Sequence, residues 1–193
     1  MKGAWRRTPG TVWALLLAVG VGVATPTFVY LIRLFGFRIP QPNIEADYLE
    51  GLLWALALGA SIFLWPAPAR DKRPLLILWG AKCLVTLGFM LLYEWHYGLD
   101  AYMYFDQSRA QISPLHDMGW GRGTENLIGL AWIQSSILPP SYHALKVSFA
   151  MVGLVSVYLT YRGAVRFRGE EDIRLLYVLG LFPSILFWSS ILG

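Results

Sequence analysis

Cysteine, histidine and charge are all scarce in this chain. Its 193 residues include one cysteine and three histidines, and only 15% are charged. The single cysteine, Cys83, excludes an intrachain disulfide, and no paired C-x-x-C or H-E-x-x-H occurs. Neither the G-x-x-x-x-G-K-[ST] phosphate loop nor the G-x-S-x-G turn of a serine nucleophile is present. We therefore expect no metal site and no cofactor.

Apolar residues make up most of the chain instead. They account for 56% of it, and the mean hydropathy of +0.49 is typical of a membrane protein. A helix needs about 20 mostly apolar residues to cross the hydrocarbon core. We predict an all-α integral membrane protein, 1–193 forming a single membrane domain, with about five transmembrane helices. The predicted spans cover residues 11–32, 52–65, 75–93, 142–161 and 175–193.

Basic residues gather in three of the connections. The first group precedes the first span, the second lies between the second and third spans, and the third lies between the last two spans. The groups are Lys2, Arg6 and Arg7; Arg70, Lys72 and Arg73; and Arg162, Arg166, Arg168 and Arg174. Cytoplasmic loops carry such an excess, so the N-terminus is predicted to be cytoplasmic. The net charge is +4, but binding a nucleic acid requires a basic face exposed to water, and this apolar chain offers little such surface. We therefore expect no nucleic-acid partner.

The shorter connections have simple interpretations. Residues 33–50 are predicted to lie outside the membrane, held extended by Pro40 and Pro42. Pro74 closes the basic loop before the third span, and Lys82 within that span is expected to snorkel to the surface. The chain stops at the outer end of its last predicted span, so we expect it to be the N-terminal part of a longer protein.

The longest connection, residues 94–142, is predicted to be external and too aromatic for a disordered linker. Residues 127–138 are apolar but too short to span, which favours a short interfacial helix. Ser141 is placed to cap the helix that follows. Ionisable groups at a membrane boundary are candidates for function.

Helical phasing separates the two aspartates of this loop. If residues 98–110 are helical, Tyr97, Asp100 and Tyr104 share one face, whereas Tyr102, Asp106 and Arg109 share another. Asp106 can pair with Arg109 one turn later. Asp100 has no basic partner at helical spacing other than His96, so it could act as a general base or merely favour the helix dipole.

Two segments resemble membrane glycosyltransferases of the GT-C fold. Tyr-Gly-Leu-Asp-Ala-Tyr-Met-Tyr-Phe-Asp at 97–106 is similar to their first external loop, and Phe-Pro-Ser-Ile-Leu-Phe-Trp-Ser-Ser at 182–190 is similar to a later helix of some bacterial members. In that superfamily the acidic loop usually follows the first helix, whereas two extra spans precede it here. No Asp-x-Asp occurs.

The resemblance implies transfer of a sugar from a polyprenyl-phosphate donor to an acceptor hydroxyl at the external face of a bacterial inner membrane. Asp100 would be the base, and Arg109 and Arg122 would hold the donor phosphate, because arginine matches phosphate oxygens. Further substrate-binding candidates are His96, Tyr104 and Asp106. The aromatic residues fit an interfacial belt equally well.

Two other classes of function stay open. The chain could be a non-catalytic subunit or scaffold of envelope polysaccharide assembly or transport, with partner membrane subunits. A transporter would need polar residues facing each other at mid-membrane, and only Lys82 and Lys146 approach that description.

Overall fold

The computed structural model describes residue 14 and residues 25–97, 100–110, 114–138 and 140–190. Within these ranges every regular element is a helix, and no strand occurs. Three helical segments are long and apolar enough to cross a membrane: Ile44–Leu64, Ala69–His96 and Tyr142–Arg168. The predicted all-helical class is confirmed, whereas the predicted count of five spans is not. The first predicted span lies largely outside the described residues.

Helix α2 (Ile44–Ser61) begins earlier than predicted. It follows a helical segment at 25–36 and a short turn, and it continues into the 3₁₀ helix η1 (Ile62–Leu64). The Asn43 side chain accepts a 3.0 Å hydrogen bond from the amide of Ala46, which satisfies a free donor of the first turn. The prediction of an extended connection up to residue 50 was wrong, because acidic residues are favourable at a helix start.

The second long segment has three parts. Helix α3 (Ala69–Cys83) leads into a π-helical stretch, η2 (Leu84–Phe89), and then into α4 (Met90–His96). Pro74 lies inside α3 and is buried, so it does not close a loop as predicted. Trp79 of α3 donates a 3.0 Å hydrogen bond to the carbonyl of Ala55 in α2, which joins the two segments.

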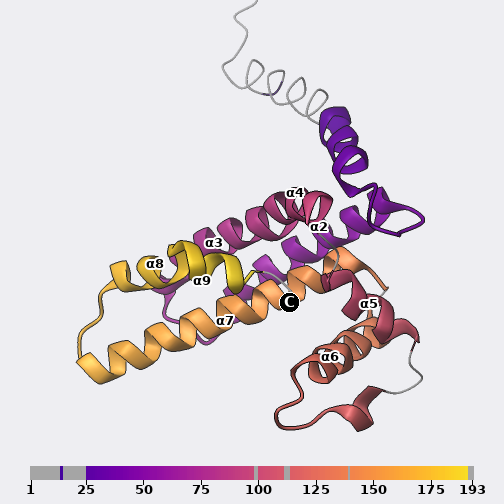
Figure 1. Ribbon diagram of the computed structural model, residues 1–193. Helices are drawn as coiled ribbons and strands as arrows, with labels where there is room; N and C mark the ends of the chain where they lie inside the picture. The colour runs from indigo at the N-terminus through magenta and orange to yellow at the C-terminus, as the bar shows by residue number, and fades with distance from the viewer. Residues whose placement is uncertain (1–13, 15–24, 98–99, 111–113, 139, 191–193) are drawn as a thin grey trace, which may run out of the picture.

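Helix α7 (Tyr142–Arg168) forms the long axis of the bundle and packs against α2, α3 and α8 (Figure 1). Ser141 caps it as predicted, since its hydroxyl accepts a 3.1 Å bond from the amide of Ala144. The helix ends at Gly169, whose φ of 73° is the left-handed conformation that glycine adopts readily. It therefore extends well beyond the predicted end at residue 161.

The predicted last span is broken in two. Helix α8 (Ile173–Leu181) ends before Phe182, and α9 (Pro183–Trp188) starts at a proline, which cannot continue the hydrogen bonds of the preceding helix. Gly153 of α7 lets the residues after α9 approach closely, because a Cβ there would overlap the carbonyl oxygen of Ser189.

Between the second and third long segments, the chain forms a helical pair beside one end of the bundle. Helix α5 (Asp100–Ala110) packs against α6 (Gly123–Ile137), and the 3₁₀ helix η3 (Pro114–Asp117) lies between them in sequence (Figure 1). The predicted segment at 127–138 coincides largely with the later part of α6. These helices cover the end of the bundle at which α4 finishes and α7 begins.

Candidate functional site

Five ionisable side chains are buried together at the end of the bundle next to α5. They come from all three long segments: Asp47 from α2, Glu94 from α4, and Tyr142, His143 and Lys146 from the first turns of α7. None exposes more than 7% of its surface. We call these five residues the buried network. Burying ionisable groups is costly unless they pair, so each contact within the network matters to the fold.

Asp47 holds the start of α7 from a neighbouring helix. Its Oδ1 accepts a 2.8 Å hydrogen bond from the amide of Tyr142, and its Oδ2 accepts one of 3.3 Å from the amide of His143. The same Oδ2 lies 2.5 Å from Nδ1 of the His143 ring. One carboxylate thus satisfies two of the amides that a helix start leaves free, and it also orients the imidazole.

Glu94 joins α4 to the same turns of α7. Its Oε1 accepts a 2.7 Å hydrogen bond from Nζ of Lys146 and a 2.5 Å bond from the hydroxyl of Tyr142. The Lys146 ammonium also lies 4.9 Å from the centroid of the Tyr142 ring, within the range of a cation–π contact. The carboxylate is therefore held by a cation and a neutral donor on one oxygen.

Two atoms of the network are buried and unsatisfied. Oε2 of Glu94 and Nε2 of His143 have no hydrogen-bond partner among the described residues. Buried polar atoms usually have a partner, either in the protein or in ordered water. Each of these two atoms can therefore form a hydrogen bond with a further small polar group.

Aromatic side chains of α5 pack on the network. The ring of Tyr102 lies 5.3 Å from that of Tyr142, and the ring of Phe105 lies 5.8 Å from it. The Tyr102 hydroxyl donates a 3.0 Å hydrogen bond to the carbonyl of Pro40. Partial burial, with the nearby carboxylate of Asp106, raises the pKa of Tyr102. The helix that carries Asp100 is thereby fixed to the bundle.

Asp100 is the first residue of α5, and its side chain lies outside what the structure describes. Asp106 and Arg109 are both exposed on this helix, and Tyr104 is half-buried. No ion pair joins Asp106 to Arg109, although both are described; the Arg109 guanidinium lies over the ring of Phe105 instead, 5.6 Å from its centroid. The expected pairing of these two residues was wrong.

The other two predicted site residues lie on different elements. His96 is exposed at the end of α4 and contacts the ring of Tyr97 at 4.7 Å. Arg122 precedes α6, beside an open hollow of about 980 Å³, and donates a 3.2 Å bond to the carbonyl of Asp117. No hydrogen bond, ion pair or ring contact joins any two of the described side chains of His96, Tyr104, Asp106, Arg109 and Arg122.

Lys82 does not snorkel as predicted. It is fully buried, and its ammonium donates a 2.8 Å hydrogen bond to the carbonyl of Ser189 and also contacts the Ser189 and Ser190 hydroxyls. These acceptors come from the residues just after α9. The lysine thus joins α3 to the C-terminal helices.

Sequence reasoning missed Asp47, Tyr142 and His143. Lys146 was noted as a cation inside an apolar run, and that is the signal that could have led to the network, because a buried cation requires an acceptor nearby. Within the described ranges, no three His, Cys, Asp or Glu side chains form a group that could hold a metal ion. Comparison with family descriptions, curated proteins and solved structures finds no match for this chain.

Proposed function

We propose that this protein is an integral membrane glycosyltransferase that moves a sugar from a polyprenyl-phosphate donor to an acceptor hydroxyl at the external membrane face. Asp100 is the general base in this proposal. The three long apolar helices, which have the length and composition of membrane spans, support the location. The resemblance of 97–106 and 182–190 to GT-C enzymes supports the reaction.

The observation that carries the proposal is the position of α5. This helix begins with Asp100 only four positions after α4 ends at His96, so the aspartate stands where a candidate span finishes. The aromatic contacts of Tyr102 and Phe105 with Tyr142 fix α5 against the bundle. A base must be held in place to act on an acceptor hydroxyl, and a helix fixed at several points provides that rigidity.

The other proposed roles follow from charge and exposure. Arg109 is exposed on α5, and Arg122 is exposed before α6, the helix packed against α5. Both guanidinium groups are accessible to the phosphate oxygens of a donor. His96, Tyr104 and Asp106 supply polar and aromatic contacts to a sugar. The basic residues at the opposite end of α7 favour a cytoplasmic location for that end and an external location for α5.

The proposal is tested with Asp100→Asn in the full-length protein, in native membranes, with a panel of polyprenyl-phosphate sugars. Asparagine keeps the size of the side chain but cannot take a proton. We expect kcat to fall by about 10²- to 10⁴-fold, with little change in KM for the donor. Glu125→Gln, an exposed substitution in the first turn of α6, is the matched control and should keep full activity.

Two outcomes would overturn the proposal at different points. If Asp100→Asn transfers sugar as fast as the wild type, Asp100 is not the base. If the wild-type protein consumes none of the donor lipids, the enzymatic function itself is wrong, and a non-catalytic subunit of envelope polysaccharide assembly becomes the better interpretation.

A further inference from the structure

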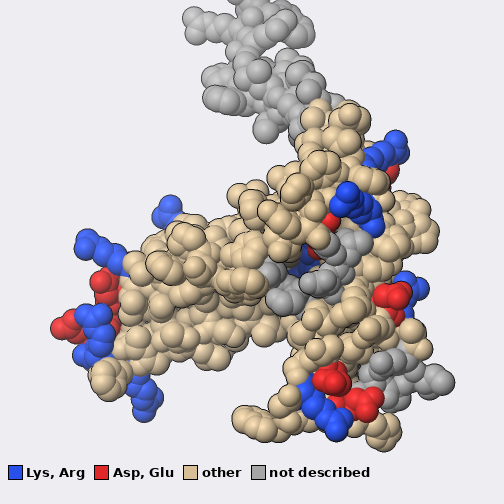
Figure 2. All heavy atoms as spheres, in the orientation of Figure 1, with Lys and Arg blue, Asp and Glu red and all other residues tan. Residues whose placement is uncertain are grey.

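The end of the bundle away from α5 is rich in charge. Figure 2 shows blue and red side chains gathered there around the end of α7 and the starts of α3 and α8. The described charged residues of these segments are Arg70, Asp71, Lys72, Arg73, Arg162, Arg166, Arg168, Glu170, Glu171, Asp172 and Arg174. Cations outnumber carboxylates, so this end can attract anions.

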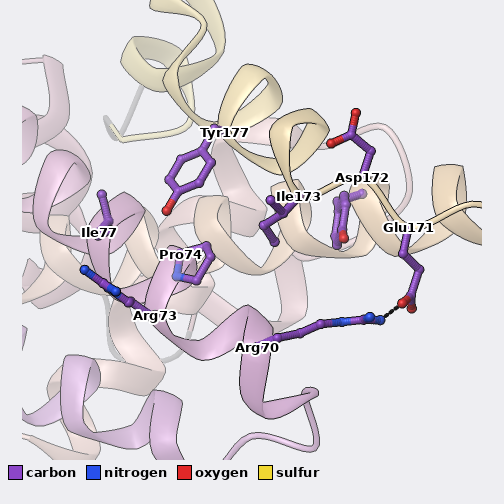
Figure 3. Close-up of a pocket in the computed structure, with 9 residues that line it drawn as sticks. Arg70, Arg73, Pro74, Ile77, Glu171, Asp172, Ile173 and Tyr177 are labelled. Carbon is purple, nitrogen blue, oxygen red and sulfur yellow. Dashed lines mark ion pairs between the residues drawn. The ribbon is translucent and has the colours of Figure 1, made fainter.

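A pocket of about 580 Å³ opens at this end between α3 and α8 (Figure 3). One side of it is already neutralised. Arg70 forms an ion pair with Glu171, whose other oxygen lies 3.3 Å from Nη1 of Arg162. Asp71, fully buried beneath, accepts a 2.9 Å hydrogen bond from the hydroxyl of Tyr158. These contacts pair the charges of Arg70, Asp71 and Glu171. The remaining carboxylate of the lining, Asp172, accepts a 2.9 Å hydrogen bond from the amide of Arg174, and Figure 3 shows it directed away from Arg73.

The other side of the pocket offers a free cation. Arg73 is exposed and makes no hydrogen bond or ion pair with any described residue. Figure 3 shows the Tyr177 hydroxyl directed from α8 toward α3, on the side of the pocket where Arg73 lies. Tyr177 likewise has no hydrogen-bond partner among the described side chains. A guanidinium and a phenol together can donate several hydrogen bonds to one phosphate group.

Apolar side chains continue from this cationic side. Pro74, Ile77 and Ile173 line the pocket beside Arg73, and Ile77 is 47% exposed on the surface of the bundle. A free phosphate makes no favourable contact with an apolar surface. A phospholipid does, because its acyl chains begin directly below its headgroup. The combination of one anionic group with an adjoining apolar strip is the chemistry of an anionic phospholipid.

We propose that the pocket between α3 and α8 binds an anionic membrane phospholipid, with Arg73 and Tyr177 on its phosphate and the first acyl carbons along Ile77. The proposal rests on the membrane location proposed above, but not on the glycosyltransferase activity. The bound lipid anchors the start of α3 to α8 at the membrane surface.

The test uses the full-length protein purified in a mild non-ionic detergent and mixed with phosphatidylglycerol or phosphatidylcholine. Native mass spectrometry then measures the fraction of protein that retains lipid. We expect about fivefold stronger retention of phosphatidylglycerol, the factor that one basic residue near an anionic headgroup gives. Arg73→Gln should remove this preference, and Tyr177→Phe should reduce it about twofold.

Arg166→Gln is the matched control, because Arg166 is an exposed cation at the same end of the bundle but does not line the pocket. The proposal is overturned if Arg166→Gln weakens retention as much as Arg73→Gln, since diffuse charge would then explain the binding. It is also overturned if millimolar inorganic phosphate displaces the lipid, which would identify free phosphate as the ligand. Release of the protein from membranes by alkaline carbonate would instead refute the membrane location.

Discussion

The contact between Glu94 and Lys146 makes a quantitative prediction about stability. Both side chains are almost completely buried, with 3% and 1% exposure, and 2.7 Å separates Oε1 from Nζ. Lys146→Met leaves the carboxylate with the Tyr142 hydroxyl as its one donor, since Oε2 has no partner among the described residues. Removing one partner of a buried pair costs about 3–5 kcal/mol. Glu94→Gln should cost a similar amount, because the ammonium is then left without a counter-ion.

The double variant, Glu94→Gln with Lys146→Met, separates this pairing from simple loss of packing. With both charges gone, no uncompensated ion is left at this contact, and the amide oxygen introduced by Glu94→Gln can still accept from the hydroxyl of Tyr142. We therefore expect the double variant to lose less unfolding free energy than the two single variants do together, by at least about 2 kcal/mol.

The assay is reversible unfolding of the reconstituted protein by titration with sodium dodecyl sulfate, followed by the fluorescence of its nine tryptophans. Arg33 and Glu45 provide a control, because they form an ion pair at the surface, with 66% and 34% side-chain exposure. Arg33→Met and Glu45→Gln should leave the unfolding midpoint almost unchanged. Losses at Glu94 and Lys146 that add to within about 0.5 kcal/mol in the double variant would refute the coupling.

Two further predictions concern α7. Gly153→Ala should destabilise the protein by about 1–3 kcal/mol in the same titration, because its Cβ would overlap the Ser189 carbonyl oxygen. Gly163→Ala on the same helix should be neutral or stabilising by up to about 1 kcal/mol, since no neighbouring atom lies within 4 Å of its Cβ; equal losses at the two glycines would contradict the close approach of the residues after α9. Asp47→Ala should speed hydrogen exchange at the amides of Tyr142 and His143, whose hydrogen bonds the carboxylate accepts, whereas Asp47→Asn should preserve much of the protection. Unchanged exchange in Asp47→Ala would show that α7 does not depend on this cap.

The features predicted correctly from the sequence depend on neighbouring residues. Ser141 was identified as a helix cap because a cap and the amide it accepts are three residues apart, in this case Ser141 and Ala144. The helix assumed over 98–110 for the phasing of the two aspartates is observed as α5 over Asp100–Ala110, and residues 98–99 lie outside the described ranges. The helical class and the approximate places of the three long segments follow from apolar composition alone.

The features that were missed depend on distant residues. Asp47 looked like a loop residue because it lies among acidic neighbours, and its partner His143 is 96 residues away. Lys82 was expected to reach water because the C-terminal serines that accept its hydrogen bonds could not be placed from the sequence. Pro74 was expected in a loop because proline usually interrupts a helix, whereas it lies buried inside α3.

The π-helical stretch η2 sets the rotational register between two polar contacts. Lys82, before η2, faces the residues after α9, while Glu94, after it, faces α7. Each residue of an α-helix adds about 100° of rotation, so loss of one residue between positions 84 and 89 would turn Glu94 away from Lys146 while Lys82 stayed on Ser189. The number of residues in this short stretch therefore matters more than which apolar residues they are. Single-residue insertions or deletions there should be rarer in evolution than apolar substitutions.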